Sequence, residues 1–151
     1  MRVIPHAEQR YDTIGDYWED PDGTWQIRVS DLGDWRYNFS VMLHEFVEFA
    51  AIQARGVPES EVLAFDLASD WDDPGFDPAA PYHWEHVLAD SIERLVSIPL
   101  GTEIADMEAA AARLPQWQPA HVAQSAEQLP CKQPVGGSIP SRGHQTEDDE
   151  V

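Results

Sequence analysis

The chain has 151 residues, and 28 Asp and Glu against 9 Lys and Arg give it a formal net charge of -19. This charge argues against a nucleic-acid ligand, because phosphates would be repelled, but it leaves a basic host protein open as a partner. No apolar run approaches the roughly 20 residues of a membrane span, so we expect a cytoplasmic protein with no membrane partner. The single Cys131 excludes a cysteine-based zinc site.

The first part of the chain predicts two short strands separated by turns. Residues Arg2–Ile4 form the first expected strand, which Pro5 ends. Residues 11–24 are acidic and turn-rich, with DPDG as the strongest turn signal. Trp25–Ser30 alternates apolar and polar residues, as a half-buried strand does. A loop over residues 31–36 should then lead into a helix.

Residues 38–55 predict the central helix of the fold. Their apolar residues leave no wide polar stripe, so we expect a mostly buried helix. Gly56 suits its C-terminal end, and Arg55 suits the negative end of the helix dipole. Asn38 or Ser40 can cap its start.

Two further helices are expected after the central one. Residues 58–70 predict a short helix with Pro58 in its first turn. Residues 71–81 contain too much Pro, Gly and Asp for regular structure, and we expect an acidic loop over the site. Residues 82–100 predict the second long helix, which Gly101 ends.

A last helix completes the predicted domain. Thr102 can cap residues 103–114, and Pro115 stops them. These elements predict an α+β domain over residues 1–115. In it, a small antiparallel sheet or hairpin packs on the central buried helix together with two or three further helices.

Residues 116–151 predict a disordered tail, because Pro, Gly, Ser and charged residues dominate them. Within this tail, HVAQSAEQLPCKQPVGGSIPSRGHQ resembles a translated threonine transfer RNA gene. VAQSAEQ can be written as codons that match the D arm, LPCKQ as the anticodon arm, and GGSIP as the T arm. We therefore expect that the reading frame runs into a tRNA gene and that this segment contributes nothing to a site.

The central helix carries an unusual group of ionisable residues, His44, Glu45 and Glu48, in its apolar body. Burying unpaired ionisable groups is costly, so these side chains need partners or a metal. His44 and Glu48 are four residues apart and share one helix face. The pattern HExxE matches the HExxH motif of zinc peptidases except for its second ligand, with Glu45 at the position of the general base.

A metal needs further ligands, and the second long helix supplies them near its start. We predict His86 as the third ligand beside His44 and Glu48. Asp66, Glu85 and Glu93 are predicted around these ligands. Histidine and carboxylate make a divalent ion the expected cofactor, zinc most of all, although a carboxylate lets manganese or iron compete.

Two other interpretations stay open at this point. HExxE arises often in helices by chance, and Glu45 and Glu48 can instead pair with Arg28 or Arg36 in a structural network. The net charge also suits a non-catalytic acidic protein that occupies a basic site on a host protein, in the manner of a DNA mimic.

Several segments resemble a family of small phage and bacterial proteins. They are YDTIGDYWED, IRVSDLGDWRYNF, LHEFVEFAAIQARGV, AFD, DPGFDPAAPYHWEH and IERL, within residues 11–100. The resemblance implies a phage context and directs attention to the predicted site residues. It implies no activity, because none is established for the family. A more distant similarity to zincin metallopeptidases rests on HExxE and on the order strand, then helix.

Overall fold

The computed structural model describes residues 1–118. The predicted tail, with its likeness to a tRNA gene, lies outside the described residues from residue 119 onward. The described part has the predicted α+β fold. Its strands and helices are β1 (Arg2–Ile4), β2 (Gly15–Glu19), β3 (Trp25–Ser30), α1 (Trp35–Arg55), α2 (Glu59–Ala68), α3 (His83–Leu100) and α4 (Ile104–Ala111), with short 3-10 turns η1 (His6–Glu8) and η2 (Pro74–Phe76).

The sheet is mixed, with strand order β1-β3-β2. β2 and β3 form the antiparallel hairpin, and β1 pairs with β3 in parallel, which the expectation of an antiparallel sheet did not include. β2 lies inside residues 11–24, which the sequence predicted as turns. Asp16 occupies a buried position of this strand where an apolar residue is expected, and so the strand pattern is hidden in the sequence. The Asp16 carboxylate pairs with Arg10, whose Nε lies 2.6 Å from Oδ2.

Helix α1 begins at Trp35, three residues earlier than predicted. Asp34 is its N-terminal cap, since the carboxylate accepts a hydrogen bond from the Arg36 amide at 2.9 Å. Asn38, one of the expected caps, instead accepts from the Leu32 amide and so holds the loop before the helix. Gly56 ends α1 as predicted, in a left-handed conformation with a φ of 76°.

The other helices match the predicted positions within a few residues. α2 ends at Ala68, α3 begins at His83, and Gly101 ends α3 with a φ of 64°. Thr102 does not cap α4; its hydroxyl donates to the Ser97 carbonyl at the end of α3. Within residues 1–118, no helix combines the length and apolar character needed to cross a bilayer.

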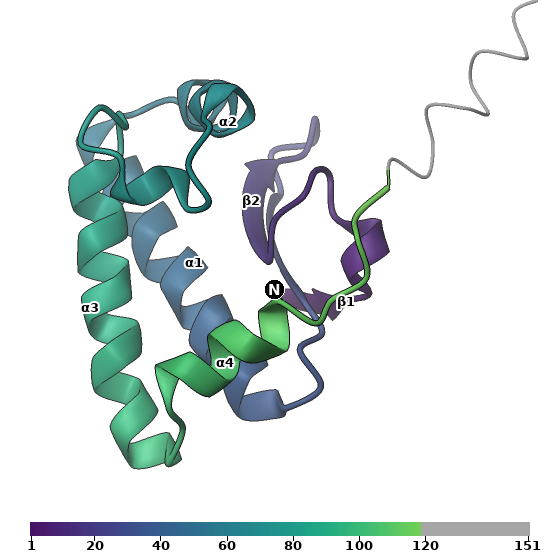
Figure 1. Ribbon diagram of the computed structural model, residues 1–151. Helices are drawn as coiled ribbons and strands as arrows, with labels where there is room; N and C mark the ends of the chain where they lie inside the picture. Colours follow the sequence, from purple (N-terminus) through teal and green to yellow (C-terminus); the bar gives the residue numbers. More distant parts are fainter. Residues whose placement is uncertain (119–151) are drawn as a thin grey trace, which may run out of the picture. The chain divides into compact units, whose positions relative to one another are not determined.

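Helix α1 lies between α3 and the sheet (Figure 1). It is less buried than predicted, because one face presents the side chains of Trp35, Phe39 and Phe46 to solvent. The contacts on the other faces of α1 are the ones that matter for the site. α3 covers one side of α1 and β2 covers another, so residues of all three elements can meet next to α1.

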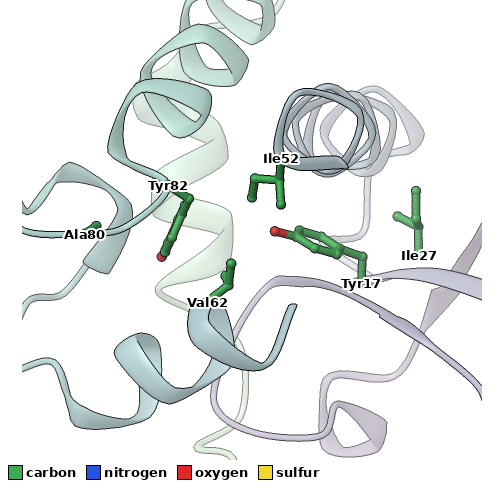
Figure 2. Packing of buried hydrophobic residues seen from close by; sticks show 6 residues of the cluster. All are labelled: Tyr17, Ile27, Ile52, Val62, Ala80 and Tyr82. Atoms are coloured by element: carbon green, nitrogen blue, oxygen red, sulfur yellow. The ribbon is translucent and has the colours of Figure 1, made fainter. Parts of the chain in front are cut away.

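Two apolar clusters form the core. One joins β2, β3, α1, α2 and the loop before α3, and Figure 2 shows its members Tyr17, Ile27, Ile52, Val62, Ala80 and Tyr82. The other joins β3, α1 and α4 through Val29, Leu32, Val41, Met107 and Ala110. The polar segment from His44 to Glu48 lies on α1 between Val41 and Ile52. The apolar core is therefore interrupted at this level by ionisable groups.

Candidate metal centre

Helices α1 and α3 bring together three ionisable side chains that we call the triad: His44, Glu48 and His86. His44 and Glu48 lie one turn apart on α1, and His86 lies in the first turn of α3. His86 Nδ1 is 2.8 Å from Glu48 Oε2 and 3.2 Å from His44 Nε2, and the remaining pair is 3.5 Å apart. Ligands around a tetrahedral zinc ion are about 3.3 Å apart. The triad therefore has the spacing of three metal ligands.

Each triad residue also has a partner on its far side. Glu93 Oε2 lies 3.0 Å from His44 Nδ1, which directs the other nitrogen of this imidazole toward the triad. Asp73 Oδ1 lies 3.2 Å from His86 Nε2, at ion-pair distance without hydrogen-bond geometry. The Tyr17 hydroxyl donates to Glu48 Oε1 at 3.3 Å. Such outer partners orient metal-binding side chains and fix the tautomer of the histidines.

The loop before α3 packs directly on His86. The Phe76 ring meets the imidazole edge to face, with centroids 4.7 Å apart. Gly75 approaches the same ring so closely that a Cβ there would lie 2.2 Å from His86 Cγ. Any larger residue at this position would therefore force the imidazole to shift. The predicted acidic loop does contact the site, through Asp73, Gly75 and Phe76.

Glu45 and the triad line the same cavity. The volume of this cavity is about 1120 Å³. Its carboxylate packs against β2, where a Cβ on Gly15 would lie 2.1 Å from Glu45 Oε1. Burial, and next the charge of Glu48, raise the pKa of Glu45 well above its ordinary value. Enzymes raise the pKa of carboxylates that act as general bases by burial of this kind.

The electrostatics of the triad without a metal follow from its carboxylates. Burial alone would lower the pKa of both histidines, but the carboxylates around them outweigh it. Glu48 and Glu93 raise the pKa of His44 to about 11, and Asp73 and Glu48 raise that of His86 to about 9. Burial would raise the pKa of Glu48, yet the two histidines keep it below its ordinary value.

The three carboxylates predicted around the ligands have different surroundings. Glu93 contacts His44, as described above. Glu85 instead pairs with Arg55, whose Nε lies 2.6 Å from its Oε1, and this pair ties the end of α1 to the start of α3. Asp66 accepts hydrogen bonds from the hydroxyls of Tyr11 and Tyr82.

The arginines considered as partners for Glu45 and Glu48 are engaged elsewhere. Arg36 pairs with Asp34 at the start of α1, with 2.6 Å between Nη2 and Oδ2. The Arg28 guanidinium stacks over the Trp18 ring, 4.5 Å from its centroid. The polar cluster in the core is therefore built from histidine, carboxylate and tyrosine.

Several residues of the site could not be identified from the sequence. Asp73 stands in a run of acidic loop residues without a distinguishing spacing, and Tyr17 belongs to the strand that was not predicted. Gly75 and Gly15 have no positive φ, so turn chemistry does not mark them. Their only signal is the close approach of another side chain, which depends on tertiary packing.

In comparisons with known proteins, no family model, no curated protein and no solved structure matches the chain. Any assignment of function must therefore start from the geometry of the triad.

Proposed function

We propose that this protein is a metal-dependent hydrolase in which His44, Glu48 and His86 bind one divalent ion, zinc foremost. The observation that carries the proposal is the convergence of Nε2, Oε2 and Nδ1 of these residues, each within 4.8 Å of the others. The outer contacts of Glu93 and Tyr17 support it, because they orient two of the three ligands. Three protein ligands leave a fourth position of a tetrahedral ion for water or substrate.

A divalent ion in this place would polarise a carbonyl group and lower the pKa of water to about 7. Glu45 takes the proton of the attacking water as its oxygen bonds to the carbonyl carbon of an amide or ester. The bond from that carbon to the leaving nitrogen or oxygen then breaks, and Glu45 returns the proton to the leaving group. The raised pKa of Glu45 suits both transfers.

One observation favours a second candidate, a structural ion-pair network without metal. The raised pKa values of His44 and His86 make protonated imidazoles favourable partners of Glu48, Glu93 and Asp73. Breaking such a network by removing one partner costs about 3 to 5 kcal/mol of unfolding free energy. The two candidates differ in metal content, which can be measured directly.

The test is elemental analysis of the full chain, as purified and after zinc, manganese or iron is added. We expect about one equivalent of metal per chain. His44→Ala should lose it. His83→Ala, on the same helix as His86, removes a 3.0 Å contact with the Gly75 carbonyl but no proposed ligand, and it should still bind about one equivalent at saturating metal. If neither the parent protein nor the His83→Ala variant binds metal even after addition, the metal-centre proposal is wrong and the structural network stands.

Glu45→Gln tests the catalytic half of the proposal. The variant keeps the shape of the side chain but cannot take a proton, so its metal content should equal that of the parent. Hydrolysis of a panel of p-nitrophenyl esters and peptide anilides should fall by about 10² to 10⁴-fold. Equal rates in parent and variant would exclude Glu45 as the base.

A further inference from the structure

The cavity beside the triad contains a carboxylate, Asp66, that lacks a cationic partner among the described residues. Asp66 lies on α2 and accepts hydrogen bonds from two phenols, at 3.1 Å from the Tyr11 hydroxyl and at a shorter distance from the Tyr82 hydroxyl. Three separate segments thus converge on one carboxylate. This degree of positioning exceeds what a solvent-exposed aspartate needs.

The arginines that line the cavity are already engaged by other acids. Arg10 binds Asp16 at 2.6 Å and Glu59 at 2.9 Å, and Arg94 binds Asp90 at 2.8 Å. Within residues 1–118, no arginine forms an ion pair with Asp66. Its charge is therefore left to hydrogen bonds from neutral hydroxyls.

A second, independent feature of the cavity also calls for a cationic or hydrogen-bond-donating ligand. Glu93 lines the cavity and is only 7% exposed, yet its Oε1 has no hydrogen-bond partner in the described part of the chain. A buried carboxylate oxygen without a partner is costly, and a ligand that donates to it recovers that cost. Asp66 and Glu93 thus give the cavity carboxylate oxygens that can accept hydrogen bonds from a cationic group.

The contacts of the triad place these two carboxylates next to different histidines, Asp66 next to His86 through Tyr82 and Glu93 next to His44. The Tyr82 hydroxyl donates to Asp66, and the Tyr82 ring packs edge to face on His86, with ring centroids 6.2 Å apart. Glu93 contacts His44 directly. A substrate whose carbonyl lies at the triad can therefore extend a side chain toward Asp66.

We propose that Asp66 binds the positively charged side chain of a basic peptide substrate, so that the site hydrolyses amide bonds next to a guanidinium or ammonium group. This inference rests on the proposed metal-dependent hydrolase. Tyr11 and Tyr82 position Asp66, and each carboxylate oxygen keeps a lone pair for the incoming cation after it has accepted one phenol hydrogen bond.

The test uses the full chain loaded with cobalt(II), whose visible absorption reports ligands that join the metal. Four hydroxamates share the metal-binding group and differ in charge: acetohydroxamate, arginine hydroxamate, citrulline hydroxamate and glutamate hydroxamate. Arginine and citrulline side chains have nearly the same shape. We expect arginine hydroxamate to bind at least about tenfold more tightly than citrulline hydroxamate, as one charge-assisted hydrogen bond provides. Glutamate hydroxamate should bind most weakly.

Asp66→Asn should remove the preference for arginine hydroxamate over citrulline hydroxamate. Asp22→Asn is the matched control, because Asp22 lies in the turn between β2 and β3 and outside the cavity. It should keep the preference.

The outcomes separate the two proposals. If the parent protein binds cobalt and acetohydroxamate but does not distinguish arginine from citrulline hydroxamate, the cationic subsite is overturned while the metal centre stands. This comparison needs no variant, so it holds even if Asp66→Asn does not fold. A parent protein that binds no cobalt overturns the metal centre, and the subsite with it.

Discussion

At the scale of single residues, the site depends on which nitrogen of each histidine is available. Glu93 engages His44 Nδ1, and Asp73 lies near His86 Nε2, so the remaining nitrogens face each other across 3.2 Å. Two facing imidazole nitrogens cannot both keep lone pairs at this distance without a shared proton or ion between them. Glu48 completes the group with a carboxylate oxygen.

Gly75→Ala tests how closely the loop supports His86. The new Cβ would lie 2.2 Å from His86 Cγ, and the buried imidazole would have to move. We expect the affinity for zinc to fall by about 10 to 100-fold, as for other changes that disorient a ligand. Titration against a competing chelator measures this.

Gly15→Ala is the control for that substitution, since the three atoms nearest its Cβ would all belong to the Glu45 side chain. Glu45 is buried and must shift to admit this Cβ, but it is not one of the proposed metal ligands. Zinc affinity should therefore stay near that of the parent while hydrolysis falls. An equal loss of zinc affinity in both variants would contradict the separate roles of the two glycines.

The protonation of the histidines makes the stability of the metal-free protein depend on pH. The folded state raises the pKa of His86 to about 9 and that of His44 to about 11. Their contribution is complete below the unfolded value of about 6.5 and is lost as pH rises through 9 and then 11. Urea unfolding of chelator-treated protein should show a decrease of roughly 1 to 3 kcal/mol between pH 6.5 and pH 9.5. A stability that rises over this interval would show that the histidines are neutral in the folded state.

At the scale of elements, α1 organises the site because it contributes two triad residues and Glu45 and contacts both α3 and the sheet. Its two ends are fixed in different ways. Asp34 caps the first turn, and Arg55 in the last turn binds Glu85 at the start of α3. The second contact ties the end of α1 to the start of α3, the same turn that carries His86.

Asp34→Ala removes the cap of α1. We expect a loss of about 1 kcal/mol of unfolding free energy, because the Arg36 amide loses its acceptor. Asp70→Ala, the same change at an exposed position after α2, should alter stability by less than about 0.5 kcal/mol. Urea unfolding measures both. If the two variants lose the same stability, Asp34 does not act as a cap.

At the scale of the whole molecule, the proposed metal links α1 to α3 and should stabilise the folded state. Zinc at about 100 times its dissociation constant contributes about 2.7 kcal/mol if the unfolded chain does not bind it. The midpoint of thermal unfolding should then rise by roughly 10 °C over that of chelator-treated protein. His44→Ala should show no such difference between the two conditions, and a shift of the same size in that variant would mean that zinc binds elsewhere.

The sequence by itself determined the features that depend on near neighbours in the chain. The alternation in β3, the glycines after α1 and α3, and the shared face of His44 and Glu48 all follow from local geometry, since a helix or strand repeats every few residues. Asp34 is also a residue type that caps helices, but the polar residues around it predicted a loop.

Only the tertiary structure decided which of these features meet. The contacts of Asp73 with His86 and of Tyr17 with Glu48, like the approach of Gly75 to the imidazole, join segments whose spacing in the sequence follows no helix or strand period. β2 escaped prediction because a buried aspartate, paired with a partly exposed arginine, took the place of an apolar residue. Such contacts depend on how whole faces pack, and the packing of one face is determined by every element that covers it.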